Sequence, residues 1–81
     1  MIMKMYSIKD ELNGFGGPIP FMSEEIAERW FKTNMIENVN MKNNPKDYSL
    51  WYMGTFDTES GTYICKAADI KLIQRGENYG D

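Results

Sequence analysis

The fold is decided by the uncharged stretch Ser49-Leu50-Trp51-Tyr52-Met53-Gly54-Thr55-Phe56. It is followed by Asp57-Thr58-Glu59-Ser60-Gly61 and then by Thr62-Tyr63-Ile64-Cys65-Lys66. Aromatic and β-branched residues favour strands. An aspartate can open a type I turn, and a glycine can adopt the left-handed conformation that closes it. The stretch therefore predicts a β-hairpin.

The residues near the N-terminus predict a strand and an irregular loop. Met3 to Lys9 is rich in apolar and aromatic residues but too short for a stable helix, so it is predicted to form a strand. Asp10 to Pro20 contains three glycines and two prolines and is predicted to form the loop. Each proline forces the residue before it into an extended conformation, so Ile19 to Phe21 is expected to form a short edge strand.

A helix is predicted to begin at Ser23, whose hydroxyl can cap free backbone N–H groups. Acidic residues follow it, where the helix dipole is positive. Apolar residues then recur at three- and four-residue spacing and give the helix one apolar face: Ala27, Trp30, Phe31 and Met35. An asparagine-rich stretch and Pro45 predict that the helix ends between Met35 and Asn38, and that residues 38–47 form a loop.

The order of these elements predicts an α+β fold. Ala68 to Gln74 supplies a possible last strand. We expect a small antiparallel sheet of three to five strands with one α-helix packed on one face. The chain has 81 residues, which is enough for one small domain. Residues 1–74 are predicted to form that domain, and residues 75–81 a flexible C-terminal tail.

Composition argues against several classes of function. Nine Lys and Arg against twelve Asp and Glu give a net charge of −3, whereas proteins that coat DNA are cationic. The chain has no histidine, and its one cysteine, Cys65, lies in a predicted strand without an imidazole partner. We therefore expect a protein that is not an enzyme and needs no metal or other cofactor.

The expected location is the cytoplasm. The N-terminus lacks the basic and apolar regions of a signal peptide, and no uncharged run approaches the roughly 20 apolar residues that span a bilayer. A single cysteine cannot form an internal disulfide, which small secreted domains usually need. We expect no contact with a membrane.

Both faces of the predicted sheet are apolar. If Phe56 pairs with Thr62, one face carries Trp51, Met53, Thr55, Tyr63, Cys65 and Ala67. This face has no charge and is expected to meet the helix. The opposite face would carry Leu50, Tyr52, Gly54, Phe56, Ile64 and Lys66, joined by Lys4, Tyr6 and Ile8 of the first strand. One helix covers only one side of a sheet, so something else must cover the second.

Two hypotheses explain the second apolar face. It can be the interface of a homodimer, which lets a chain of this size bury more apolar surface, with Phe15, Ile19 and Phe21 of the early loop folding across its edge. It can also be a platform for single-stranded nucleic acid, with bases stacked on Tyr6, Tyr52 and Phe56 and phosphates bound by Lys4 and Lys66. The two hypotheses are compatible if a dimer forms along one edge of the sheet.

Several motifs resemble a known family. They are Met3-Lys4-Met5-Tyr6-Ser7-Ile8-Lys9-Asp10, Pro20-Phe21, Arg29-Trp30-Phe31 and above all Pro45-Lys46-Asp47-Tyr48-Ser49-Leu50-Trp51-Tyr52-Met53-Gly54-Thr55-Phe56-Asp57 with Ser60-Gly61. Together they resemble the small non-structural protein of gokushoviruses, the single-stranded DNA phages within the Microviridae. The resemblance extends from Met3 to about Ile73.

The resemblance implies a protein made in the cytoplasm of the infected bacterium and absent from the capsid. Members of the family are described as associated with phage DNA replication and as single-stranded DNA-binding proteins that favour the synthesis of progeny single strands. This implies single-stranded DNA as a partner. The rival hypothesis is a protein adaptor that docks on a phage or host replication protein, or on a procapsid protein, without touching DNA.

Overall fold

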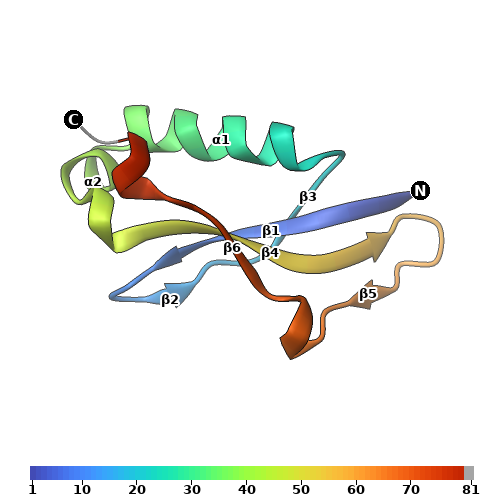
Figure 1. Ribbon diagram of the computed structural model, residues 1–81. Helices are drawn as coiled ribbons and strands as arrows, with labels where there is room; N and C mark the ends of the chain where they lie inside the picture. Colours follow the sequence, from blue (N-terminus) through green and yellow to red (C-terminus); the bar gives the residue numbers. More distant parts are fainter. Residues whose placement is uncertain (80–81) are drawn as a thin grey trace.

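The computed structural model describes residues 1–79, which form a six-stranded antiparallel sheet with its main helix on one side (Figure 1). Strands β1 and β4 pair along most of their length at the centre. Strands β2 and β3 pair with β1, and β5 and β6 pair with β4. The strands are β1 (Ile2–Asp10), β2 (Gly14–Phe15), β3 (Ile19–Phe21), β4 (Tyr48–Asp57), β5 (Tyr63–Ile64) and β6 (Lys71–Arg75). The helices are α1 (Glu24–Glu37) and α2 (Val39–Asn43), with 3-10 turns at Pro45–Asp47, Ala67–Asp69 and Gly76–Tyr79.

The predicted α+β class is confirmed, and the number of strands is higher than expected. The sheet has six strands rather than three to five, because β2 is a two-residue strand in the predicted loop that no hydrophobic pattern indicates. No helix in residues 1–79 has the length and apolar character needed to cross a membrane.

Helix α1 begins where the sequence predicts. The Ser23 hydroxyl accepts a hydrogen bond from the backbone N–H of Ile26 at 3.3 Å, which caps the first turn. The helix ends at Glu37, and the N–H of Asn38 donates to the carbonyl of Asn34 at 2.8 Å. The residues that α1 buries are Ala27, Phe31 and Met35. The apolar spacing in the sequence therefore identifies the buried face of the helix.

The asparagine-rich stretch is not the loop that was predicted. Asn38 caps a second helix, because its side-chain oxygen accepts a hydrogen bond from the N–H of Met41 at 3.2 Å. Met41, in α2, is only 5% exposed and belongs to the core. The prediction was wrong because asparagine is a poor interior helix residue but a strong cap.

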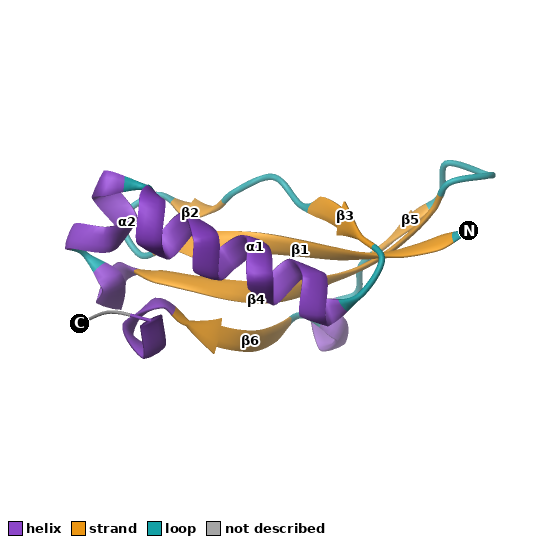
Figure 2. Cartoon of the chain, turned by 90° about the horizontal axis from the view of Figure 1, so that it is seen from above, coloured by secondary structure: helices purple, strands orange, loops and turns teal. Residues whose placement is uncertain are grey.

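The core lies between α1 and the sheet. Figure 2 looks down on α1 and shows it lying along β1 and β4. The buried cluster consists of Tyr6, Ala27, Phe31, Met35, Met41 and Leu50, and Ile8 and Tyr52 pack against it. The helix therefore covers the Tyr6, Leu50 and Tyr52 face, and the prediction that it covers the Trp51 face was wrong. Both faces are uncharged along β4, so charge could not distinguish them.

A β-bulge at Gly54 changes which residues share a face. Lys4 pairs with Thr55 and Tyr6 with Tyr52. The two pairs are therefore two residues apart on β1 but three residues apart on β4, so β4 has one extra residue. Gly54 has a φ of +96°, which glycine adopts readily. Beyond the bulge Phe56 pairs with Met3, on the face opposite Lys4 and Tyr52. The predicted common face for Tyr52 and Phe56 is therefore wrong.

The hairpin register also differs by one residue from the prediction. Phe56 pairs with Tyr63 rather than with Thr62, and Thr55 pairs with Ile64. A one-residue shift moves every side chain of the second strand to the other face. Strand β5 is short, so Cys65 and Lys66 lie beyond it.

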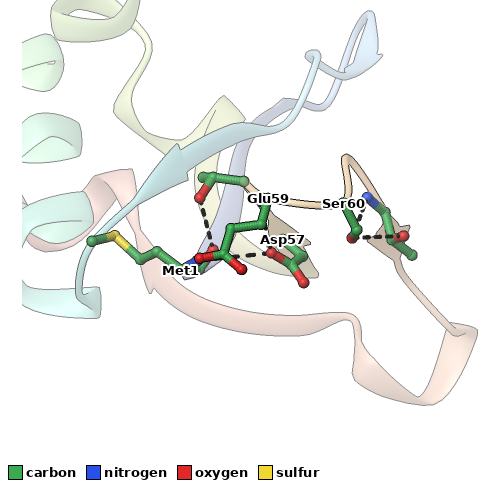
Figure 3. A network of polar contacts seen from close by, with 6 residues as sticks. Met1, Asp57, Glu59 and Ser60 are labelled. Atoms are coloured by element: carbon green, nitrogen blue, oxygen red, sulfur yellow. Dashed lines mark hydrogen bonds and ion pairs between the residues drawn. The ribbon is translucent and has the colours of Figure 1, made fainter.

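The turn between β4 and β5 is held by a network of polar contacts (Figure 3). A carboxylate oxygen of Asp57 accepts the N–H of Glu59 at 2.9 Å, and this backbone bond lowers the pKa of Asp57. The N–H of Gly61, whose φ is +76°, donates to the carbonyl of Asp57 at 2.8 Å. The amino group of Met1 lies 3.8 Å from the carboxylates of Asp57 and Glu59. The aspartate and the glycine take the roles that the sequence predicts.

Residues 75–79 are part of the folded unit, although the sequence predicts a flexible tail from residue 75. Arg75 ends β6, and Gly76–Tyr79 forms a 3-10 turn. Gly76 is buried, and the Tyr79 ring meets Phe31 at 5.8 Å between ring centroids. The aromatic contact with α1 explains why the chain stays on the domain. Residues 80 and 81 of the predicted tail lie outside the described residues.

Candidate nucleic-acid interface

The sheet has a face opposite α1, which we call the open face. Residues paired directly across neighbouring strands lie on the same side of a sheet. The residues of the open face alternate with Tyr6, Ile8, Leu50 and Tyr52, which pack beneath α1. Three rows define it: Phe15, Lys9, Ser49 and Arg75; Ser7, Trp51 and Leu72; and Met3, Phe56 and Tyr63.

An aromatic pair beside a cation forms one end of the open face. The rings of Phe15 and Trp51 meet edge to face, with 5.5 Å between centroids. The Lys9 ammonium nitrogen lies 5.3 Å from the Phe15 ring centroid and 5.7 Å from that of Trp51. The Trp51 indole N–H donates to the Ser49 hydroxyl at 2.8 Å, which fixes the orientation of the indole.

The open face exposes several apolar side chains. Phe15 and Tyr63 are each 43% exposed and Leu72 is 37% exposed, whereas Trp51 and Phe56 are half-buried and Ser7 and Ser49 are buried. A patch of this kind typically marks a binding surface. It lies on the side of the sheet away from α1 (Figure 1).

The charge of the open face differs in sign from that of the whole chain. The residues of its three rows include Lys9 and Arg75 and no carboxylate. The nearest acidic partner of Lys9 is Glu11, with 3.9 Å between nitrogen and oxygen in an exposed pair. Exposed pairs of this kind contribute only about 0–1 kcal/mol and are easily exchanged for another anion. The face can therefore meet phosphates although the net charge is −3.

The five residues predicted to touch DNA do not form one surface. Tyr6 is 0% exposed beneath α1, so it cannot stack on a base. Lys4, Tyr6 and Tyr52 line a cleft on the helix side, and Phe56 belongs to the open face. Lys66 is exposed beyond β5, where its backbone N–H donates to Asp69 at 3.1 Å. Two features of the fold separate these five residues: the bulge at Gly54 places Phe56 on the other face from Tyr52, and α1 covers the face that carries Tyr6.

The cleft on the helix side has a volume of about 210 Å³. The first residue of α1 and three strands line it, through Lys4, Tyr6, Glu24, Tyr52, Lys71 and Ile73. The Tyr6 phenol donates to a Glu24 carboxylate oxygen at 3.3 Å. Burial of the phenol and the nearby Glu24 carboxylate raise the pKa of Tyr6 well above its usual range. Tyr6 is therefore a neutral hydrogen-bond donor at physiological pH.

Sequence reasoning missed most of the open face. The sequence predicts Trp51 on the helix side, and the predicted DNA-contacting set contains none of Phe15, Lys9 and Arg75. A signal was present at Gly54, because a glycine inside an aromatic strand indicates a bulge. The short ladder that brings Phe15 beside Lys9 had no comparable signal, since Gly14–Phe15 is only two residues long.

Comparison with known proteins identifies the family. A family model described as Phage ORF5 protein matches residues 3–79. The chain belongs to the phage ORF5 family. Protein ORF5 of Chlamydia phage 1 is 34% identical over 89 residues, which cover 100% of this chain and 92% of that relative. No solved structure matches the chain.

Family membership confirms the resemblance drawn from the sequence motifs. The match covers both central strands, α1 and β6. The protein is therefore a small phage protein, and its open face and helix-side cleft are features of an ORF5 protein.

Proposed function

We propose that this phage protein binds single-stranded DNA on the open face and assists phage DNA replication, without catalysis, in the cytoplasm of the infected bacterium. The observation that carries this proposal is the pair of Phe15 and Trp51 beside the Lys9 ammonium group. Accessible aromatic rings beside cations suit sequence-independent binding, because every base has a face that stacks. The phage family supplies a setting in which single-stranded DNA is a plausible ligand.

The expected energy is sufficient for measurable binding. Each base stacked on an aromatic side chain contributes on the order of 1–3 kcal/mol, so bases on Phe15 and Trp51 together contribute about 2–6 kcal/mol. The hydrogen bond from Trp51 to Ser49 holds one of these rings in place before binding. Little conformational entropy is then lost when a base stacks.

The proposal predicts a weak dependence on salt. Lys9 and Arg75 are the two cations of the open face. If each neutralises one phosphate, the logarithm of the affinity should fall with the logarithm of the salt concentration with a slope of about −1.4, from about −0.7 for each single-strand contact. A cationic coat protein would show a much steeper slope.

The test is a titration of a short labelled oligothymidylate, followed by anisotropy at two salt concentrations. The variant Lys9→Gln/Trp51→Ala removes one cation and one ring of the open face. The matched control Lys32→Gln/Lys42→Gln removes two exposed cations from the helices. We expect the first variant to lose most of the affinity and the control to retain it. Equal loss in both variants, or no binding at low salt, would refute the proposal.

A second proposal is that the open face docks on protein rather than on DNA, either on a second copy of the chain or on a phage or host replication protein. It is favoured by Leu72, which is exposed and pairs with Trp51, and by Tyr63, which is exposed and pairs with Phe56 farther along β4. Both residues add exposed apolar surface to the open face. Light scattering separates the proposals. A dimer that Trp51→Ala converts to a folded monomer supports self-association, whereas a monomer that binds the oligonucleotide supports the DNA platform.

A further inference from the structure

The helix-side cleft has the composition of a small-ligand site. Two lysines and one glutamate surround a floor made of Tyr6, Tyr52 and Ile73. Among residues 1–79, the ion pairs involve none of Lys4, Lys71 and Glu24. Opposite charges therefore share one cleft without neutralising one another in a salt bridge.

The sheet places the two lysines on either side of Tyr52. Tyr52 pairs with Tyr6 on β1 and with Lys71 on β6, and Lys4 lies two residues before Tyr6 on the same side of β1. Neighbouring strands are about 4.8 Å apart and two residues span about 6.8 Å along a strand, so the Cα atoms of the two lysines are about 12 Å apart. Two flexible ammonium groups at this spacing can converge on one phosphate.

The floor of the cleft suits a planar ring. The rings of Tyr6 and Tyr52 lie 5.5 Å apart at an interplanar angle of 67°, and Ile73 completes the apolar lining. The cleft volume of about 210 Å³ exceeds the 150 Å³ of an apolar cavity that holds benzene in another protein. A six-membered ring therefore fits, with space left for a polar substituent.

Glu24 supplies an acceptor with a fixed position. Its carboxylate accepts the Tyr6 hydroxyl at 3.3 Å, so Tyr6, which is buried, orients it from below. A carboxylate is a suitable acceptor for an exocyclic amine such as that of cytosine. The lysines and the glutamate give the cleft a charge of +1, which matches an anion that also carries a donor.

We propose that this cleft binds a nucleoside 5′-phosphate. The base rests against Tyr52 and Ile73, its exocyclic amine donates to Glu24, and its phosphate lies between Lys4 and Lys71. The ligand can be a free mononucleotide or the phosphorylated end of a strand. The site lies on the opposite side of the sheet from the open face, so it is independent of the proposed DNA platform.

The test follows amide chemical shifts of isotopically labelled protein during titration with dCMP, deoxycytidine and inorganic phosphate. We expect dCMP to shift the amides of Lys4, Tyr52 and Lys71 in a saturable way, and to bind more tightly than dTMP, which lacks an exocyclic amine. Lys4→Met and Lys71→Met should each weaken binding about fivefold, as for the loss of one exposed ion pair. Lys32→Met, on the exposed surface of α1, should change nothing.

The sources of the ligand are separated by comparing dCMP with 5′-phosphorylated and unphosphorylated oligocytidylate. These titrations use Lys9→Gln/Trp51→Ala, in which the open face is disabled. Tighter binding of the phosphorylated strand than of dCMP indicates the end of a strand, and the reverse indicates a free nucleotide. Absence of saturable shifts with dCMP, or shifts that survive in Lys4→Met/Lys71→Met, would overturn the proposal. The DNA platform would still stand if the open face bound oligothymidylate.

Discussion

Substitution of Gly54 by alanine tests the β-bulge that determines which side chains share each face of the sheet. Gly54 has a φ of +96°, and a Cβ built there would lie 2.1 Å from the carbonyl oxygen of Ile64 and 3.0 Å from the Cα of Cys65. Both neighbours are backbone atoms, so no side chain can rotate away. We expect the alanine to force β5 away from β4.

The magnitude follows from two contributions. A non-glycine residue held at positive φ costs about 1–3 kcal/mol. Displacement of β5 breaks the pairs Thr55 with Ile64 and Phe56 with Tyr63, and each lost backbone hydrogen bond costs about 0.5–1.5 kcal/mol. With about two hydrogen bonds lost, we therefore expect Gly54→Ala to lower the free energy of unfolding by about 2–6 kcal/mol.

Two other glycines provide matched controls. Gly61 has a φ of +76° with no atom within 4 Å of an added Cβ, so Gly61→Ala should lower stability only by the cost of a positive φ, about 1–3 kcal/mol. Gly17 has neither a positive φ nor a neighbour within 4 Å, so Gly17→Ala should change stability by less than about 0.5 kcal/mol. Urea unfolding followed by circular dichroism measures all three. A Gly54→Ala loss no greater than that of Gly61→Ala would refute the close approach of β5.

Two further predictions concern α1 and the residue beneath it. The pKa of Tyr6 is higher in the folded protein than in the unfolded chain, where it is about 10. The contribution of Tyr6 to the stability of the fold is therefore fully present below about pH 10 and is lost as the pH rises above that value. Tyr6→Phe should therefore lose less stability than the wild type between about pH 9 and pH 11.5 in urea titrations, and parallel pH profiles would contradict the assignment. Ser23→Ala removes the cap of α1 and should cost about 1 kcal/mol, whereas Thr33→Ala on the exposed side of the same helix should cost much less. Equal costs would show that the Ser23 cap contributes nothing.

The main elements of the fold could be predicted because each has a local cause. Ser23 caps α1, and Ala27, Phe31 and Met35 form a stripe that only a helix brings together. Asp57 and Gly61 provide the acceptor and the positive φ that the hairpin turn needs. These signals act within a few residues, so they can be recognised without coordinates.

The faces of the sheet depended on information that is not local. Leu50 and Trp51 are both apolar, and only packing against Phe31 and Met35 decides that Leu50 is the buried one. The bulge at Gly54 then places Phe56 on the other side from Tyr52. The predicted DNA-contacting set therefore mixed residues of two faces, although its general inference of a second apolar face agrees with the structure.

The C-terminal residues show a similar limit. Tyr79 packs on Phe31 across 48 positions of the sequence, and no short-range pattern predicts that contact. The available signal was the presence of an aromatic residue, Tyr79, in the predicted tail. Burying a tyrosine ring against the core stabilises a fold more than burying a polar side chain does, so such a residue favours an ordered C-terminus.

The most direct test of the open face uses the two tryptophans as separate reporters. Trp30 packs against Phe21 on the helix side, and Trp51 lies on the open face. Trp30→Phe therefore leaves Trp51 as the only tryptophan, on the proposed DNA-binding surface, and Trp51→Phe leaves Trp30, which lies away from it. Each variant is titrated with oligothymidylate while its tryptophan fluorescence is recorded. We expect saturable quenching in Trp30→Phe and little change in Trp51→Phe. Quenching confined to Trp51→Phe, or bound DNA that leaves the fluorescence of Trp51 unchanged, would contradict it.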